Sequence, residues 1–213
     1  MVWLAIDTSS QIATYALKVG EQIYTREQHG VATHAQTILT LINDLLKEAG
    51  IELKDISNIV VGRGPGSFTG LRVACAVVKG LAFVNHVAIY PVSNLALIAW
   101  IARKKYPKKT ILSVIDARMQ QVYWALYTPS NYAALEYVDS IAHINAPEHA
   151  FVLAGYNFHE YSYLIPPHWP IIAQEQINTY AVAMIEMCEN NLITPVTVAQ
   201  LEPVYVREQV TQG

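Results

Sequence analysis

Cysteine is scarce in this sequence of 213 residues, which contains only Cys75 and Cys188. The two lie far apart, and neither stands in the paired Cys or Cys/His spacing that holds a structural zinc ion. None of the seven histidines is four positions from another, so the helical two-histidine metal motif is missing as well. We therefore expect a reduced protein of the cytoplasm, with no disulfide and no metal site.

Charged residues are also few. They make up 15% of the chain, against roughly 25% in typical soluble domains, whereas 53% of the residues are hydrophobic and the mean hydropathy is +0.23. This composition excludes a disordered or fibrous chain. The net charge of −3 gives no general attraction to phosphate backbones or to anionic membranes. Any contact with a nucleic acid must therefore be local, or be made by a partner protein.

A long uninterrupted hydrophobic run is absent from the sequence. The most apolar stretch, residues 71–102, is interrupted at several positions, among them Lys79, Asn85, His86, Pro91 and Asn94. It never offers the roughly 18 clean apolar residues of a membrane span, so we interpret it as a buried helix, strand and helix. The apolar N-terminus lacks a basic segment and contains Asp7, so a secretory signal is not expected either.

The basic residues that are present cluster between the two halves of the chain. Residues 103–109 hold five of the fourteen basic side chains, from Arg103 to Lys109. We interpret this run as the C-terminus of a helix, where cations meet the negative end of the dipole, followed by a linker broken by Pro107. A nucleic-acid patch is the less favoured interpretation, because no aromatic platform or glycine motif accompanies the run in the sequence.

The two halves of the chain repeat a short pattern. Residues 5–7 (Ala-Ile-Asp) precede Gln11 and the pair Ala16-Leu17, and residues 114–116 (Val-Ile-Asp) precede Gln120 and the pair Ala125-Leu126 at a constant offset of 109 positions. Two unrelated hairpins can share apolar alternation by chance. We favour an internal duplication, because the same pattern of strands surrounds both copies.

Apolar periodicity predicts an α/β chain. Strands are expected over residues 2–7, 12–19, 22–28, 59–61 and 87–90, and helices over 33–49, 68–84 and from Ser93 onward. In the second half we expect strands over 110–116, 121–127 and 151–154, and a helix near 179–190. Each half would thus open with antiparallel strands, and in the first half helices then alternate with parallel strands.

A carboxylate follows the first predicted strand of each half. Asp7 is followed by Thr8, Ser9 and Ser10, a set that can hold a hydrated metal or a phosphate. A turn that satisfies its own backbone is at least as good an interpretation. Asp116 has Arg118 nearby, and we expect this arginine to neutralise it.

Residues 62–70 (Gly-Arg-Gly-Pro-Gly-Ser-Phe-Thr-Gly) join a strand to a helix; we call them the glycine loop. Glycines let a ligand approach the backbone, and the free amides of a helix N-terminus favour an anion. The spacing is neither that of a Rossmann nor that of a Walker motif. A tight turn in which Ser67 or Thr69 caps the helix is an equally good interpretation.

The helix predicted over residues 68–84 is apolar almost all the way round, and Arg72 and Lys79 share its only polar stripe. Gly80 inside this helix costs about 1 kcal/mol relative to alanine, so we expect another helix to approach its backbone closely. We predict that this helix, together with the one over 33–49, forms a protein-protein contact. Burial of the helix wholly within its own chain is the alternative.

Several of these segments together resemble a known family. They are residues 6–9 (Ile-Asp-Thr-Ser), His34, residues 61–72, 79–82 and 116–118, and residues 203–207 (Pro-Val-Tyr-Val-Arg). They are similar to the TsaB (YeaZ) family of bacterial threonylcarbamoyladenosine biosynthesis proteins. The likeness extends over nearly the whole chain, and the glycine loop with its following helix is the most specific part of it.

The resemblance implies the actin-like ATPase fold (ASKHA, ribonuclease H-like), an α/β fold of two duplicated lobes with mixed sheets flanked by helices. The lobes are expected at residues 1–105 and 106–213. The implied function is to support modification of adenosine 37 in tRNAs that read codons beginning with A. In this family the protein is a non-catalytic relative of TsaD, the subunit that transfers the threonylcarbamoyl group. It pairs with TsaD and recruits the ATPase TsaE.

The resemblance also implies where partners would bind. The candidate partner-binding residues are His34, Ile38, Leu41, Leu45, Phe68, Arg72, Cys75, Ala76, Lys79 and Phe83. ATP or ADP would bind only at an interface with partners, and the candidate contacts are Asp7, Thr8, Gly64, Gly66, Ser67 and Thr69. tRNA would be met only through the complex. Without its partner the chain would form a homodimer through the same helices.

Departures from the related catalytic proteins argue against independent activity. TsaD carries a histidine metal pair after the strand equivalent to residues 87–92, where this chain has Ser93-Asn94-Leu95, so no iron or zinc is expected. Gly155 stands alone where actin-like ATPases use paired glycines to receive adenine. A small-molecule kinase of the actin-like superfamily stays open as the alternative. A metallopeptidase-like hydrolase is disfavoured because its ligand set is missing.

Overall fold

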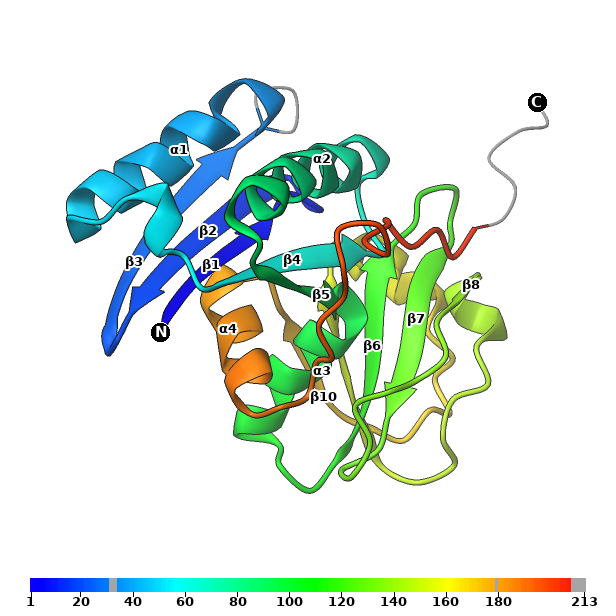
Figure 1. Ribbon diagram of the computed structural model, residues 1–213. Coiled ribbons are helices and arrows are strands. Elements are labelled where there is room, and N and C mark those ends of the chain that lie inside the picture. The colour runs from blue at the N-terminus through cyan, green and yellow to red at the C-terminus, as the bar shows by residue number, and fades with distance from the viewer. Residues whose placement is uncertain (31–33, 179, 208–213) are drawn as a thin grey trace. The chain divides into compact units, whose positions relative to one another are not determined.

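The computed structural model describes residues 1–30, 34–178 and 180–207, and of His34 only the backbone. The chain divides into two compact units (Figure 1). The first comprises Met1–Ser93 with Thr179–Val204, and the second comprises Asn94–Asn178 with Tyr205–Gly213. The predicted lobes were residues 1–105 and 106–213. The units differ from them because the helix over residues 94–105 belongs to the second unit, and the helix over residues 181–189 belongs to the first.

The first unit is a five-stranded mixed sheet covered by helices on both faces. Its strands are β1 (Val2–Asp7), β2 (Ile12–Val19), β3 (Gln22–His29), β4 (Asn58–Gly64) and β5 (Ala88–Ser93), in the order β3-β2-β1-β4-β5. β1, β2 and β3 pair antiparallel, whereas β4 and β5 join β1 in parallel. Helices α1 (His34–Ala49) and α2 (Phe68–Asn85) cover one face, and α4 (Ala181–Glu189) covers the other (Figure 1). A 3-10 turn, η2 (Leu53–Asp55), precedes β4.

The core of this unit follows from the periodicity of its elements. Ile38, Ile42 and Leu45 recur at helical spacing on α1 and are buried against the sheet. Leu4 and Ile6 of β1 are completely buried in the same cluster. Because alternate side chains of a strand point to opposite faces, β1 also buries its intervening residues, and β1 therefore lies at the centre of the unit.

The second unit repeats the sheet without repeating the helices. Its elements are α3 (Asn94–Lys105), β6 (Thr110–Asp116), β7 (Val122–Tyr127), β8 (Tyr137–Asp139), β9 (Phe151–Tyr156) and β10 (Ile171–Gln176). The strand order β8-β7-β6-β9-β10, with the same pairing directions, matches the first sheet strand for strand. The 3-10 turns η3 (Ile141–His143) and η4 (His159–Leu164) stand where α1 and α2 stand in the first unit. The repeated topology supports the duplication inferred from the sequence.

The predicted elements correspond closely to the observed ones. β1, β2, β6, α2 and β9 begin at the predicted residues, and the helix predicted from Ser93 onward begins at Asn94. Thr33, the predicted first residue of α1, lies outside the described residues. β8 and β10 were not predicted from the sequence. Both are edge strands, and β10 exposes alternate residues, so neither carries the apolar run by which buried strands are recognised.

Helix α2 is the one helix of the described chain that is long and apolar enough to cross a membrane. A third of its residues are buried inside the first unit, including Leu71, Ala74, Val78 and Ala82. Of these side chains, Ala74, Val78 and Ala82 pack in the same cluster as residues of β1 and β4. The helix is therefore a partly buried core helix of this fold.

Candidate functional site

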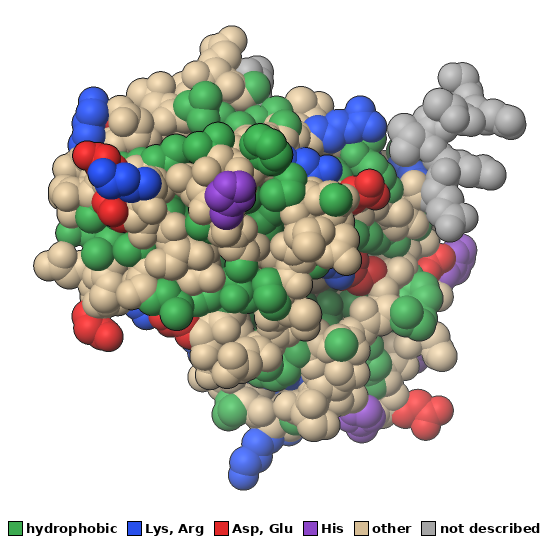
Figure 2. All heavy atoms as spheres, in the orientation of Figure 1, with side chains coloured by type: hydrophobic (Ala, Val, Ile, Leu, Met, Phe, Trp, Pro, Cys, Tyr) green, Lys and Arg blue, Asp and Glu red, His purple; other side chains and the backbone are tan. Residues whose placement is uncertain are grey.

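The outer face of α2 is an exposed apolar surface. Phe83 is 71% exposed, Val84 68% and Phe68 47%, and Leu39 on the neighbouring α1 is 60% exposed. Figure 2 shows hydrophobic side chains gathered at the surface over α2. We call this set, together with the exposed Ala76 and Gly80, the α2 surface. Apolar patches of this kind on a folded chain mark sites of protein association.

The predicted partner-binding residues divide between this surface and the core. Phe68, Arg72, Ala76 and Phe83 are exposed, and Leu41 and Lys79 are half-buried. Three others, Ile38, Leu45 and Cys75, are at most 4% exposed because they pack within the unit's own core. The prediction that these three residues contact a partner directly is therefore corrected, because their side chains are buried in the first unit and pack against its other core residues. The His34 side chain lies outside the described part of the structure.

Leu39 and Val84 belong to the α2 surface and were missed in the sequence. Leu39 follows the buried Ile38 by one position, so it borders the core face of α1 and is 60% exposed. This position at the border of the helical apolar stripe is the signal that could have identified it. Two geometric details complete the surface. The Arg72 guanidinium lies over the Phe68 ring at 3.8 Å from its centroid. A Cβ atom built on Gly80 would have no neighbour within 4 Å.

The glycine loop is packed against the turn that follows β1. The Thr8 hydroxyl donates a hydrogen bond to the Gly70 carbonyl at 2.7 Å, and the Ser67 amide donates to the Ser9 carbonyl at 2.6 Å. A Cβ atom on Gly70 would lie 1.9 Å from the Thr8 carbonyl oxygen, and one on Gly66 would lie 2.6 Å from the Ser9 carbonyl oxygen. Glycine is therefore needed at both positions, because the backbone of Thr8 and Ser9 packs directly against the loop.

The ends of the loop are also held within the first unit. Ser67 is the N-cap of α2, and its hydroxyl accepts a hydrogen bond from the Gly70 amide at 3.3 Å. The Val204 amide donates to the Arg63 carbonyl at 2.9 Å, and the Val204 carbonyl oxygen would lie 3.2 Å from a Cβ on Gly64. The capped-turn interpretation thus accounts for the loop. The amide of Ser67, which the alternative interpretation would direct at an anion, donates its hydrogen bond to the Ser9 carbonyl in the β1–β2 turn.

Asp7 lies beneath this turn and is fully buried. Its Oδ1 accepts a hydrogen bond from the Ser9 amide at 2.9 Å, whereas Oδ2 has no hydrogen-bond partner among the described residues. Burial, with a smaller contribution from the charge of Asp7, raises the pKa of Tyr15 to about 12. Of the candidate nucleotide contacts, Thr8 is hydrogen-bonded to Gly70, the residue after Thr69, and Ser67 is hydrogen-bonded to Ser9, whose amide also binds Asp7. These contacts between the turn and the loop are made by the chain itself.

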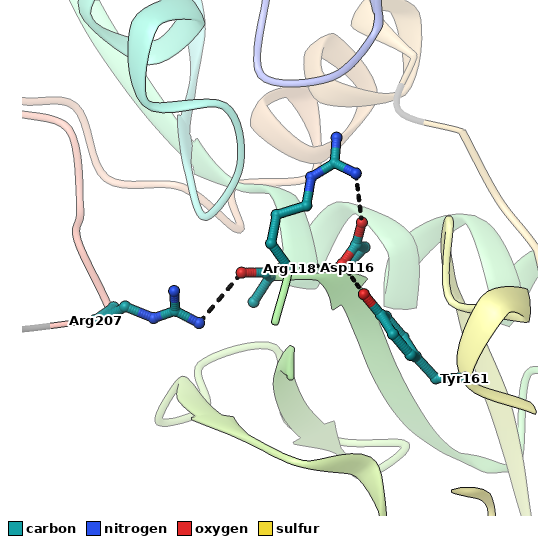
Figure 3. A network of polar contacts seen from close by, with 5 residues as sticks. Asp116, Arg118, Tyr161 and Arg207 are labelled. Carbon is teal, nitrogen blue, oxygen red and sulfur yellow. Dashed lines mark hydrogen bonds and ion pairs between the residues drawn. The ribbon is translucent and has the colours of Figure 1, made fainter. Parts of the chain in front are cut away.

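The second carboxylate is neutralised by its neighbours (Figure 3). Asp116 accepts a hydrogen bond from the Tyr161 hydroxyl at 2.8 Å and forms an ion pair with Arg118 at 3.5 Å, as the sequence predicted for Arg118. Burial, and then the hydrogen bond to Asp116, raise the pKa of Tyr161. Arg207 donates to the carbonyl of Ala117 at 3.2 Å and so anchors the same turn. Among the described residues, no group of three or more His, Cys, Asp and Glu side chains could hold a metal ion.

Comparison with known proteins identifies the family. The family model of TsaD, tRNA N6-adenosine threonylcarbamoyltransferase, matches residues 18–162, more than half of the chain. The structure of YeaZ from Pseudomonas aeruginosa superimposes with a TM-score of 0.82 at 30% sequence identity, covering 96% of this chain and 99% of that one. The chain belongs to the TsaB/YeaZ family. This result confirms the predicted family and the actin-like α/β fold with its two mixed sheets.

Two curated relatives of this family are similar in sequence over part of their length. The tRNA threonylcarbamoyladenosine biosynthesis protein TsaB of Haemophilus influenzae is 37% identical over 123 residues, which cover 57% of this chain and 52% of the relative. The protein of the same name from Escherichia coli is 38% identical over 124 residues, which cover 58% of this chain and 54% of the relative. The matched part thus spans little more than half the length of these relatives.

Proposed function

We propose that this chain is a non-catalytic subunit of the complex that forms N6-threonylcarbamoyladenosine at position 37 of tRNAs reading codons that begin with A. Its relatives in Haemophilus influenzae and Escherichia coli are named for the biosynthesis of this nucleoside. In the proposal, a TsaD-like subunit performs the transfer in the cytoplasm. The chain binds and supports that subunit and recruits a TsaE-like ATPase.

The α2 surface is the observation that carries this proposal. Although α2 packs into the core, its side chains Phe83 and Val84 are 71% and 68% exposed and leave apolar area in water. Burying this apolar area against a partner is favourable by about 25 cal/mol per Å². Leu39 on α1 extends the surface to a second helix. A helical partner laid against α2 would cover all three side chains. When that partner is missing, a second copy of the chain would take its place.

The two carboxylate turns support the absence of independent catalysis. In the glycine loop the Ser67 amide donates a hydrogen bond to the Ser9 carbonyl. A phosphate could bind this amide only by displacing the Ser9 carbonyl. Asp116 is engaged by Tyr161 and Arg118. A nucleotide, if it binds, would on this view be held at an interface with partners.

The proposal is tested by reconstituting adenosine 37 modification with a TsaD-like subunit, a TsaE-like ATPase and tRNA, with and without this chain. Phe83→Glu places a charge on the α2 surface, and Leu135→Glu is the matched control, because Leu135 is 75% exposed in the second unit. We expect Phe83→Glu to weaken pairing with the TsaD-like subunit by roughly tenfold or more and to abolish product. Leu135→Glu should leave both unchanged.

Product formed equally well without the chain would contradict the proposal. Unchanged pairing of Phe83→Glu in sedimentation would show that the partner does not use the α2 surface. The kinase alternative is separated by calorimetry with ATP and magnesium on the isolated chain. Tight binding there, with phosphate transfer to a small molecule, would replace the accessory role by a catalytic one.

A further inference from the structure

The second unit contains a buried cation without a counter-ion. Arg103, near the end of α3, is 5% exposed, and its Nη2 donates to the backbone carbonyls of Thr128 and, at 3.0 Å, Asn131. Nε and Nη1 are buried without a hydrogen-bond partner in the described chain, and no carboxylate pairs with this guanidinium there. The Tyr132 ring, 4.0 Å from the guanidinium carbon, offsets part of the cost of burial. The charge therefore remains uncompensated and makes its surroundings electropositive.

A hollow of about 220 Å³ adjoins this cation, and it is lined by Trp100, Arg103, Lys104, Pro107 and Tyr132. Trp100, Arg103 and Lys104 share one face of α3, because they are spaced three and four positions apart. The Trp100 and Tyr132 rings contact each other with centroids 5.6 Å apart and planes tilted by 57°. The hollow thus combines an aromatic wall with two cations, and its lining contains no acidic residue.

Tyr132 is brought into this wall by Arg103. It lies in the segment between β7 and β8, whose carbonyls at Thr128 and Asn131 accept the two Arg103 hydrogen bonds. The Asn131 side chain in turn accepts a hydrogen bond from the Ala133 amide at 2.8 Å. Arg103 is therefore a positioning residue for Tyr132. The aromatic platform that the sequence did not reveal beside residues 103–109 is assembled in this way from two separate segments.

We propose that this hollow binds one unpaired nucleotide of RNA, with the base against Trp100 and Tyr132 and the phosphate at Lys104. Aromatic side chains beside cations are the recurring means of holding single-stranded nucleic acid, since every base has a face that can stack. Lys108 and Lys109 come directly after Pro107, which lines the hollow, and both are exposed. They extend the positive surface on which the phosphates of an RNA backbone could lie. An acidic peptide would use the lysines but would not require two aromatic rings. The choice of RNA rests on the proposed function, whose substrate is a tRNA.

The test titrates the full chain into a labelled single-stranded oligoribonucleotide at low salt and follows its anisotropy. Lys104→Gln removes the phosphate contact, and Lys54→Gln is the matched control, since the Lys54 side chain is a 72% exposed lysine of the first unit. We expect Lys104→Gln to weaken binding several-fold and to reduce the slope of log K against log salt by about 1. Tyr132→Ala should weaken binding by about 5- to 100-fold, the loss of one stacked base.

Several results would overturn the inference. These are absence of RNA binding at low salt, equal losses in the lysine variant and its control, and a duplex that binds as tightly as the single strand. AMP that binds as tightly as the oligonucleotide would show that the ligand is a free nucleotide and not RNA. Lys104→Gln changes one exposed side chain, so its result stands even if Tyr132→Ala fails to fold.

This titration contains no partner protein and is therefore independent of the reconstitution assay. If RNA does not bind while modification still requires the chain, the inference fails and the proposed function stands. If RNA binds at this hollow while modification proceeds without the chain, the proposed function fails and the RNA site stands.

Discussion

Gly80 makes the proposed partner surface testable, because one substitution there should act in opposite directions on the free and the paired chain. Gly80 is an exposed residue inside α2, and an added Cβ would meet no atom of its own unit within 4 Å. Glycine at an interior helix position costs about 1 kcal/mol relative to alanine. Nothing in the first unit explains this cost, whereas a partner helix packed close to the α2 backbone would.

Gly80→Ala should therefore stabilise the isolated chain by about 1 kcal/mol. For a chain of this length that corresponds to a rise of roughly 2–4 °C in melting temperature. The same methyl group would overpack a close helix contact at a cost of about 1 to 3 kcal/mol, which weakens pairing roughly 5- to 150-fold. Ala76→Gly, one helical turn earlier on the same surface, is the control. It should lower the melting temperature by a similar amount and reduce pairing only slightly.

The two effects are measured by thermal unfolding of the isolated chain and by sedimentation of the chain with the TsaD-like subunit. A lower melting temperature for Gly80→Ala would show that the space above Gly80 is filled by the chain itself. A higher melting temperature with unchanged pairing would contradict the proposed interface, because Gly80 would then lie outside any close contact with the partner.

Three further predictions concern the interior. Gly70→Ala should destabilise the chain by about 3 kcal/mol or more in urea unfolding, since its Cβ would lie 1.9 Å from a backbone carbonyl oxygen; a loss below 1 kcal/mol would contradict the packing described. Burial raises the pKa of Cys75 to about 11 and that of Cys188 to about 12, so both thiols should react slowly with Ellman's reagent at pH 8 until urea unfolds the chain. Because these pKa values are raised in the folded state, their contribution to stability is complete below about pH 8.5 and should be lost as pH rises to 11–12. Tyr161→Phe removes a hydrogen bond to Asp116 and should cost about 1.5 to 3 kcal/mol, read from the unfolding midpoint.

The fold could be predicted largely from the sequence, because its buried elements repeat at clear periods. β1 is a continuous apolar run that ends in an aspartate, β6 is a mostly apolar run that also ends in one, and α2 is an apolar helix with a capping serine. β8 and β10 could not be found in this way. A three-residue strand has no period, and an edge strand that exposes alternate residues owes its conformation to pairing with its neighbour.

The sequence points to α2 as the candidate site, but it does not show which residues of this helix are exposed. Apolar residues mark both the core side and the outer side of α2, so composition could not tell the buried Cys75 from the exposed Phe83. The glycine loop shows the same limit. Glycine is required wherever backbone is approached closely, and the sequence does not say whether a phosphate or the Thr8–Ser9 turn makes the approach.

The duplication explains why the two units would meet different partners. Both contain the same five-stranded sheet, but the second has the short turns η3 and η4 where the first has α1 and α2. Turns of three and six residues that pack into the second core leave no helix face of the length of α2. In the proposed function, a helical protein partner would therefore lie against α2 of the first unit. What the second unit offers at the end of α3 is cations beside aromatic rings, and that surface is suited to a nucleotide and not to an apolar helix.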